Sequence, residues 1–294
     1  MAEENDRGCL VPECGLGNRF FAHEAAQREV AHDVTVRTRV EAMELEICVD
    51  SVESAIAAAR GGAQRIELCS GLAEGGITPS AGLIRTVRDA VAVDVFVMIR
   101  PRGGDFVYTE REFQVMREDL LTAGSLGVDG VALGILTPQC EVDIERTRSL
   151  VQLARPMQVT FHRAFDFAVD MERALEDVIA CGADRVLTSG GAESAARGAA
   201  RIAQLQRQAG DRIRIMAGGA IRESNVQALL QRTGVREVHT SMKNTEPTGG
   251  QDGDPLAAIG ARCSGRGVSQ VREEDVRRMQ DLLAFSAVRP NQSQ

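Results

Sequence analysis

From Met43 onward, apolar residues follow two alternating spacings. Short runs rich in β-branched residues alternate with longer stretches in which apolar residues return every three or four positions. The first pattern is typical of buried strands and the second of amphipathic helices, so the chain is predicted to be an α/β protein with a parallel sheet. Strands are predicted at 44–49, 65–69, 95–100, 130–133, 158–162, 185–188, 213–216 and 237–241. Helices are predicted at 51–60, 80–91, 110–123, 143–154, 170–180, 193–208, 223–232 and about 273–284.

Local signals mark several helix ends. Asp50 or Ser51 can cap the first helix, and Thr109 precedes Glu112 at the spacing of a capping box. Glycines stand where helices are expected to stop, at positions 61, 124, 182, 210 and 234. Eight units at a repeat of about 30 residues predict a (β/α)₈ TIM-type barrel with an eight-stranded parallel sheet. A doubly wound open sheet is the alternative, but neither a G-x-G-x-x-G nor a Walker sequence supports it.

The barrel domain is expected to span residues 43–285. Residues 1–42 are polar and charged and are interpreted as a disordered extension, and residues 286–294 as a C-terminal tail. Cys9, Cys14, His23 and His32 offer zinc ligands, but their spacings depart from those of structural zinc sites. The Gly-rich segment 242–271 after the last strand is either a lid or a disordered insertion.

Composition restricts the possible partners. The formal net charge is −8, which argues against a basic face for nucleic acid. No apolar run is long enough to span a membrane, and no targeting signal is expected. The seven cysteines are an odd number spread through a long chain, which favours reduced thiols in the cytosol or nucleus over a disulfide scaffold.

Alternation along the predicted strands separates the side chains that face the helices from those that face the barrel axis. The inward set contains Glu46, Cys48, Arg65, Glu67, Cys69, Phe96, Met98, Arg100, Thr160, His162 and His239. Charged groups are costly to bury, so this set needs an explanation. One is an ion-pair network of Glu46 and Glu67 with Arg65 and Arg100. The other, which we favour because these residues cluster toward strand C-termini, is a ligand or catalytic site.

Cys48 and Cys69 occupy matching places on neighbouring strands, which lie about 4.8 Å apart in a sheet. Two thiolates facing each other would suit Cu(I) better than a hard cation. The alternative is that both are small buried hydrophobes. A disulfide is disfavoured by the expected compartment.

Three further groups offer chemistry. In the loop after the third strand, Arg100 and Arg102 can grip an anion beside Asp105, and Tyr108 can donate a hydroxyl; a shaped turn with solvated arginines is equally compatible. Gly218 and Gly219 follow the seventh strand, where barrels commonly hold phosphate, although glycine pairs also serve as turns.

The third group lies at the fifth strand, where Thr160, His162, Arg163 and Asp166 cluster. His162 can act as a general acid or base oriented by a carboxylate. A structural donor is an equally valid interpretation of this histidine.

At these positions the sequence resembles the CutC copper homeostasis protein family. The resemblance rests on MELEICVDSVESA at 43–55, RIELCSGLAEGGITPS at 65–80, VFVMIRPRGGDFVY at 95–108, VTFHRAFD at 159–166, RVLTSG at 185–190 and MAGGAI at 216–221. It implies a TIM-type barrel that is cytoplasmic, in animals also nuclear, and homo-oligomeric as a dimer or tetramer. It also implies Cu(I) ligands at Cys48 and Cys69.

Three functions remain as hypotheses. The first is a cytosolic copper homeostasis protein that binds Cu(I) through Cys48 and Cys69. The second is a lyase, isomerase or hydrolase acting on a small anionic or phosphorylated metabolite. Its catalytic residues would be Glu46, Glu67, Arg100 and His162, and its binding residues Arg102, Asp105, Tyr108, Arg163, Asp166, Gly218, Gly219 and His239. The third is a purely structural scaffold whose inward charges satisfy one another.

Overall fold

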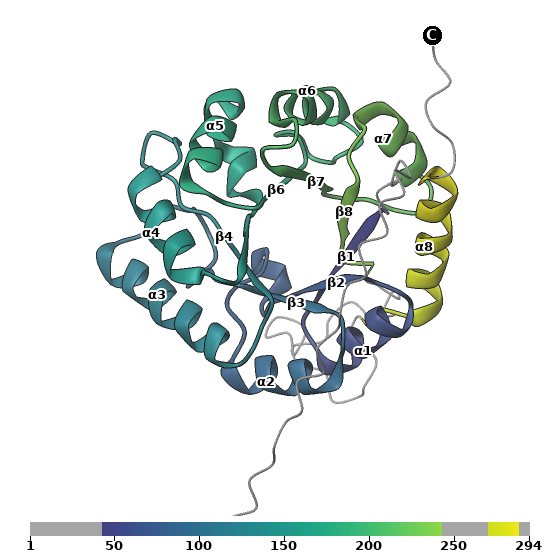
Figure 1. The fold of residues 1–294 in the computed structure, drawn as a ribbon, viewed down its shortest axis with the longest axis horizontal. Helices are drawn as coiled ribbons and strands as arrows, with labels where there is room; N and C mark the ends of the chain where they lie inside the picture. Colours follow the sequence, from purple (N-terminus) through teal and green to yellow (C-terminus); the bar gives the residue numbers. More distant parts are fainter. Residues whose placement is uncertain (1–42, 243–269, 288–294) are drawn as a thin grey trace, which may run out of the picture. The chain divides into compact units, whose positions relative to one another are not determined.

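Eight parallel strands close into a barrel in sequence order, with β8 pairing back onto β1 (Figure 1). The structure is a computed structural model that describes residues 43–242 and 270–287. The strands are β1 (Glu44–Val49), β2 (Arg65–Leu68), β3 (Asp94–Met98), β4 (Gly130–Leu133), β5 (Gln158–Phe161), β6 (Arg185–Thr188), β7 (Arg214–Gly218) and β8 (Glu237–Thr240). The predicted (β/α)₈ barrel is confirmed.

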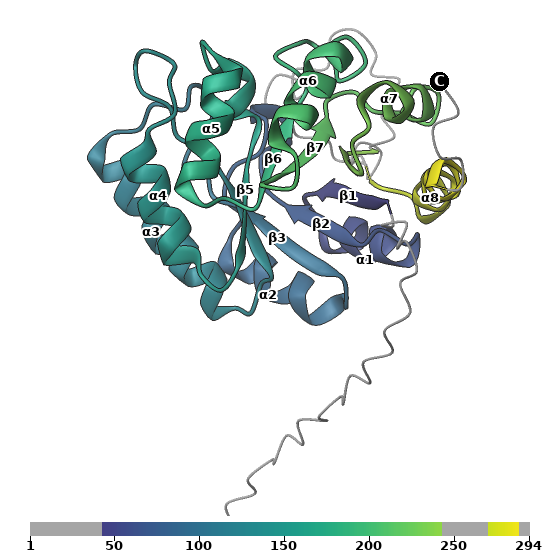
Figure 2. The same ribbon diagram turned by 45° about the horizontal axis from the view of Figure 1, so that its top comes forward.

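Helices surround the strands on the outside (Figures 1 and 2). They are α1 (Val52–Arg60), α2 (Ala81–Ala90), α3 (Glu110–Ser125), α4 (Ile144–Ala154), α5 (Met171–Cys181), α6 (Ala199–Ala209), α7 (Val226–Thr233) and α8 (Glu273–Ala287), with short 3₁₀ turns η1 (Leu72–Glu74) and η2 (Arg163–Phe167). Helix α8 packs between α7 and α1, so the last helix completes the ring around the first strand.

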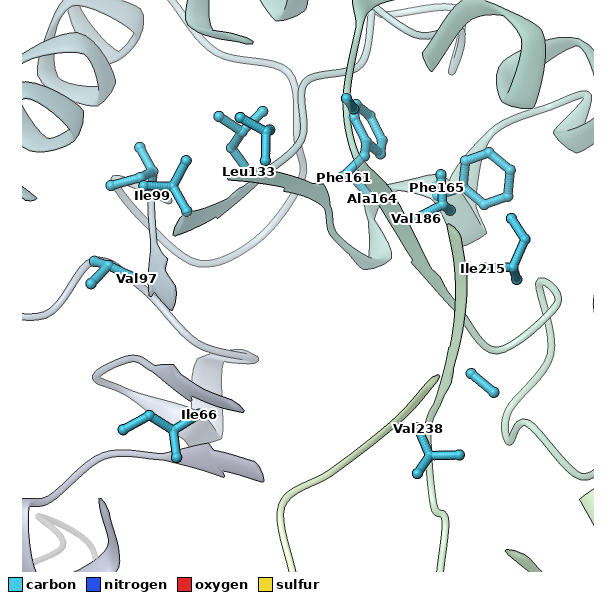
Figure 3. Packing of buried hydrophobic residues seen from close by; sticks show 14 of the residues in the cluster. Ile66, Val97, Ile99, Leu133, Phe161, Ala164, Phe165, Val186, Ile215 and Val238 are labelled. Atoms are coloured by element: carbon cyan, nitrogen blue, oxygen red, sulfur yellow. The ribbon is translucent and has the colours of Figure 1, made fainter. Parts of the chain in front are cut away.

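The main apolar core lies between the barrel and its helices. Figure 3 shows Ile66, Val97, Phe161 and Val238 on the strand faces that meet the helices, and all four are fully buried. The predicted alternation is therefore confirmed for these strands: the apolar set faces outward, which leaves the polar set inside.

Local chemistry explains where the helices begin and end. Ser51 accepts a hydrogen bond from the backbone N–H of Ser54, and Thr109 and Glu112 form the predicted capping box. Gly182 and Gly234 end α5 and α7 with a positive φ, as expected. The prediction that Gly124 ends a helix was wrong, because α3 continues to Ser125.

Helix α6 begins at Ala199, six residues later than predicted. The preceding segment is held as a loop by contacts with the loops that follow β6 and β7: Ala195 donates its N–H to the carbonyl of Gly219. Gly198 packs so tightly on Ser189 that a Cβ there would lie 1.8 Å from the carbonyl oxygen of Ser189. Tertiary contacts therefore override the helical spacing of this segment.

Several sequence predictions concern residues that the structure does not describe. Residues 1–42, nearly all of segment 242–271 and the tail from 288 lie outside the described residues, as do Cys9, Cys14, His23, His32 and Cys263. Within the described ranges, no helix combines the length and apolar character needed to cross a membrane.

The lower half of the barrel interior, toward the strand N-termini, is an ion-pair network. Arg65 donates to Glu46 at 2.5 Å and to Glu237 at 2.7 Å, and Arg185 donates to the same Glu237 oxygen at 2.5 Å. Both guanidiniums lie against the ring of Phe96, at 5.0 and 5.3 Å from its centroid. We call these five residues the lower network. All are at least 97% buried, so they satisfy one another rather than face water.

Candidate functional site

A cavity of about 470 Å³ opens above the lower network, at the carboxyl end of the strands. Its wall includes side chains from β1, β2, β3 and β8 and from the segments that follow β5 and β7. This is the end of a barrel where parallel strands deliver their last side chains and where barrel enzymes carry their sites. The predicted location of the site is thus matched by a real cavity.

Cys48, which lines this cavity, meets Cys69 of the neighbouring strand. Their sulfur atoms lie 3.5 Å apart, and both thiols are buried and free. Leu72 of η1 packs against the pair, together with Met98 and Ala132. The hydrogen bond with Cys69, burial and the nearby Glu67 raise the pKa of the Cys48 thiol well above its ordinary value, so Cys48 holds its proton at neutral pH.

His239 joins Cys48 and Glu67 from the neighbouring strand. Ligand atoms of these three residues all lie within 4.8 Å of one another. The His239 Nδ1 lies 2.6 Å from Glu46 Oε1, and its Nε2 lies 3.8 Å from Glu67 Oε2. Burial alone would lower the pKa of His239, but Glu67, Cys48 and Glu46 together raise it well above its ordinary value.

Glu46 links this group to the lower network. One of its oxygens contacts His239 and the other accepts from Arg65. Burial raises the pKa of Glu46, but Arg65 and His239 outweigh it and hold the pKa at about 2. Glu67 differs, because burial dominates there and raises its pKa, and its Oε1 has no hydrogen-bond partner.

Arg100 is buried at the cavity wall, and most of its donors bind backbone. Nη1 donates to the carbonyls of Glu74 and Gly76, and Nη2 to that of Gly104. Its guanidinium stacks on Phe106, and its Nε has no partner. The sequence-based pairing of Arg100 with an inward carboxylate was therefore wrong, because the loops after β2 and β3 fold back to meet it.

His162 lies across the cavity from the cysteines, since β5 is opposite β1 in an eight-stranded ring. Its Nδ1 accepts from the backbone N–H of Ala164, and its buried Nε2 has no partner. Burial and Arg100 lower the pKa of His162 to about 3, so the ring is neutral at pH 7. The expected carboxylate that would orient it is not there. A backbone amide fixes the ring instead.

Asp166, the carboxylate expected beside His162, holds the loop after β6. It accepts from the side chain of Thr188, from Ser189 and from the Gly191 N–H, and it pairs with Arg163 at 2.8 Å. Arg163 also donates to Ser189 and still lines the cavity. Asp166 therefore positions Arg163 rather than acting on a ligand itself.

Three residues of the β3–α3 loop, Arg102, Asp105 and Tyr108, do not line the cavity, although Arg100 and Phe106 of the same loop do. Arg102 pairs with Glu112 at 2.6 Å and with Asp105 at 3.0 Å, and it stacks on the ring of Tyr108. None of Arg102, Asp105 and Tyr108 is among the residues that line the cavity. Arg102 therefore stabilises a turn, which was the alternative hypothesis, and the predicted binding of an anion by Arg102 is not supported.

The two glycines after β7 serve different purposes. A Cβ on Gly218 would lie 2.5 Å from Leu187 and 3.3 Å from His239, so glycine lets the neighbouring strands approach. Gly219 has a φ of +106° and lines the cavity. Arg222, three residues on, lines it too. Sequence reasoning missed Arg222 because loop residues carry no periodic signal.

Fold and site together define a class: a (β/α)₈ barrel whose mouth holds a thiol pair beside an imidazole and a carboxylate. The model of the CutC family matches residues 43–244. The chain therefore belongs to the CutC family.

Known proteins agree with this assignment. The chain is 46% identical to a human protein named copper homeostasis protein cutC homolog over 242 residues, 82% of this chain and 88% of that protein. It is 51% identical to a family protein CutC from Chromobacterium violaceum over 199 residues, 68% of this chain and 81% of that one.

Solved structures agree as well. The crystal structure of a copper homeostasis protein CutC from Streptococcus agalactiae is similar at a TM-score of 0.64 and 34% identity, covering 68% of this chain and 98% of that one. A thiamine phosphate pyrophosphorylase from Pyrococcus furiosus, at a TM-score of 0.51 and 17% identity, shares the fold alone. It covers 83% of this chain and 96% of that one.

Proposed function

We propose that this protein acts in copper homeostasis by binding Cu(I) through Cys48 and Cys69. The observation that carries the proposal is the 3.5 Å separation of two buried, free thiols on neighbouring strands. Two sulfurs at this separation present one soft donor set, which suits Cu(I) and excludes hard cations by chemistry. The names of the relatives, copper homeostasis proteins, support the same role.

His239 is the third donor in this proposal. Its ring lies beside Cys48, and its Nδ1 contacts Glu46, which leaves Nε2 for the metal. A carboxylate that holds the second nitrogen of a ligating imidazole is the usual outer-shell arrangement of histidine ligands. Glu67 would then remain as a nearby acid rather than a ligand, because carboxylate oxygens are poor partners for Cu(I).

The test is a competitive titration of the full chain with Cu(I) and a chromogenic Cu(I) chelator under anaerobic conditions. Five further cysteines would obscure the result, so the reference protein carries serine at positions 9, 14, 140, 181 and 263. That reference should bind one Cu(I). Adding Cys48→Ser and Cys69→Ser should abolish binding, and adding His239→Asn should weaken it about 10- to 100-fold if the imidazole is a ligand. Unchanged stoichiometry and affinity after loss of Cys48 and Cys69 would refute the proposal.

The proposal extends to a cytoplasmic and nuclear location and to a homo-oligomer, dimer or tetramer. Four described cysteines are free, including the close pair, which is typical of a reducing compartment. Light scattering on the purified chain measures the oligomer directly, and a monomer would contradict this extension.

A further inference from the structure

We propose that the cavity also binds a small organic anion, a carboxylate or phosphate that carries hydroxyl or carbonyl oxygens, through Arg100, His162 and Arg222. This goes beyond Cu(I) binding and does not depend on it. The cavity volume of about 470 Å³ lies inside the range of roughly 300–1,000 Å³ typical of small-molecule sites. A single metal ion bound at one wall leaves most of that space to another ligand.

Buried polar atoms in the cavity wall lack partners. Arg100 Nε, His162 Nε2 and Glu67 Oε1 belong to side chains that are at least 95% buried, and none has a hydrogen-bond partner. Buried polar groups are nearly always satisfied in folded proteins. All three residues line this cavity, so a ligand there is what completes their hydrogen bonding.

The protonation of these atoms defines the ligand. Arg100 Nε is a permanent N–H donor. His162 accepts at Nδ1, so its single proton sits on Nε2 in the neutral ring. The depressed pKa of His162 keeps the ring in that form at pH 7. Two N–H donors in one wall call for oxygen acceptors on the ligand, and Glu67 Oε1 can pair with a ligand hydroxyl.

The charge of the lining favours an anion. Among the described residues that line the cavity, the guanidiniums of Arg100, Arg163 and Arg222 outnumber the one carboxylate, Glu67. The cavity lining is therefore positive although the formal net charge of the protein is −8, so the charge of the lining is opposite in sign to that of the whole protein. The side chain of Arg163 pairs with Asp166 and Ser189, whereas the side chain of Arg222 donates to the carbonyl of its own neighbour, Ile221.

The position of Arg222 agrees with this role. Arg222 follows Gly219 and Ala220, which both have positive φ values at the end of β7. The loops after the seventh and eighth strands are where barrels commonly seat phosphate or other oxyanions. The anionic end of the ligand would therefore face Arg222, and its remaining oxygens would face Arg100 and His162.

Calorimetric titration of the copper-free full chain tests the proposal with four probes: gluconate, glucose 6-phosphate, inorganic phosphate and neutral glucose. Saturable binding of at least one anion, with none for glucose, is expected. Stronger binding of gluconate would identify a carboxylate ligand, and stronger binding of glucose 6-phosphate a phosphorylated one. Binding of inorganic phosphate alone would overturn the organic ligand.

Variants decide whether the site is this one. Arg222 is exposed, so the Arg222→Gln variant should fold. The His162→Leu variant removes the N–H donor inside the cavity. Each variant should weaken anion binding about ten-fold or more, as expected for the loss of a charged or buried hydrogen bond. Arg232→Gln is the matched control, an exposed arginine on α7 outside the cavity that also donates to a backbone carbonyl. It should change nothing.

Two further results would overturn the proposal. One is equal weakening by Arg232→Gln, and the other is the absence of saturable binding of every anion up to about 10 mM. The Cys48→Ser, Cys69→Ser double variant should keep its anion binding. Because His162 lies on the opposite wall, His162→Leu should keep its Cu(I) affinity, so the two proposals fail separately.

Discussion

The lower network and the cavity above it are built from the same strands with the same alternation, yet they treat charge in opposite ways. In the lower network every carboxylate contacts a guanidinium: Glu237 accepts from both Arg65 and Arg185. In the cavity, Arg100 turns to backbone carbonyls, and Glu67 keeps an oxygen without a partner. Burial of charge alone therefore does not mark a functional site. What distinguishes the cavity is that buried polar atoms of Arg100, His162 and Glu67 in its wall lack partners.

The largest effect is expected in the lower network. Replacing Glu237 by Gln leaves Arg65 and Arg185 short of a buried counter-charge, so Glu237→Gln should lower the free energy of unfolding by about 3–5 kcal/mol. The matched control is Glu44→Gln. Glu44 also pairs with Arg65 at 2.8 Å, but its side chain is 35% exposed, so its loss should cost at most about 1 kcal/mol. Urea unfolding measures both, and equal losses would break the contrast between a buried network and an exposed pair.

A medium effect is expected from the pH dependence of His162. Its pKa is about 3 in the folded protein, below the ordinary 6.5. The folded state therefore binds fewer protons than the unfolded state below pH 6.5, and stability is complete above pH 6.5 and falls as the pH falls. The slope is about 1.4 kcal/mol per pH unit for one such group. Urea midpoints at pH 7 to 5 should show this decline in the wild type, and His162→Gln should flatten it.

His239 provides the control of opposite sign. Its raised pKa contributes stability that is present below pH 6.5 and lost as the pH rises through the folded pKa. His239→Gln should therefore leave the acid decline intact and remove stability at neutral pH. If His239→Gln rather than His162→Gln flattened the acid decline, the assignment of a neutral ring to His162 would be wrong.

The smallest effect is expected at Glu67. Because burial raises its pKa, the ionised form carries a cost in the folded protein above its unfolded pKa. Glu67→Gln at pH 7 should shift the free energy of unfolding by less than about 1 kcal/mol, toward greater stability. Glu46→Gln is the matched change one strand away. Glu46 is held at a pKa of about 2 by Arg65 and His239, so the same substitution should be clearly destabilising there. Equal effects would show that both carboxylates belong to one network.

The alternation of apolar and polar residues along the sequence predicted much of this structure. It predicted the eight strands and placed Glu46, Cys48, Glu67, His162 and His239 inside, where all are buried or nearly so. Applied to β6 and β8, the same rule finds Arg185 and Glu237, two residues before Leu187 and His239 respectively. These two inward charges were the part of the lower network that the sequence analysis overlooked, although the signal was present.

The sequence did not predict which side chains inside the barrel contact one another. Alternation says which way a side chain points but not which partner it meets, because the register between strands depends on the closed barrel. Arg100 bonds to Glu74, Gly76 and Gly104, which lie in loops shaped by glycines with positive φ. Arg222 enters the cavity from such a loop as well. Residues positioned by loops follow no period, so only the folded chain shows them.

The ring of Phe96, which the guanidiniums of Arg65 and Arg185 both contact, limits passage through the barrel. Gly130 on the adjacent strand leaves room for that ring, since a Cβ there would lie 2.5 Å from it. Phe96 and the charged residues of the lower network therefore fill the barrel axis beneath the cavity. A ligand that reaches the thiols must therefore enter and leave through the cavity that Arg163 and Arg222 line. A metal ion and an organic anion would then use the same opening of the cavity, so the order in which they bind would determine the order in which they can dissociate.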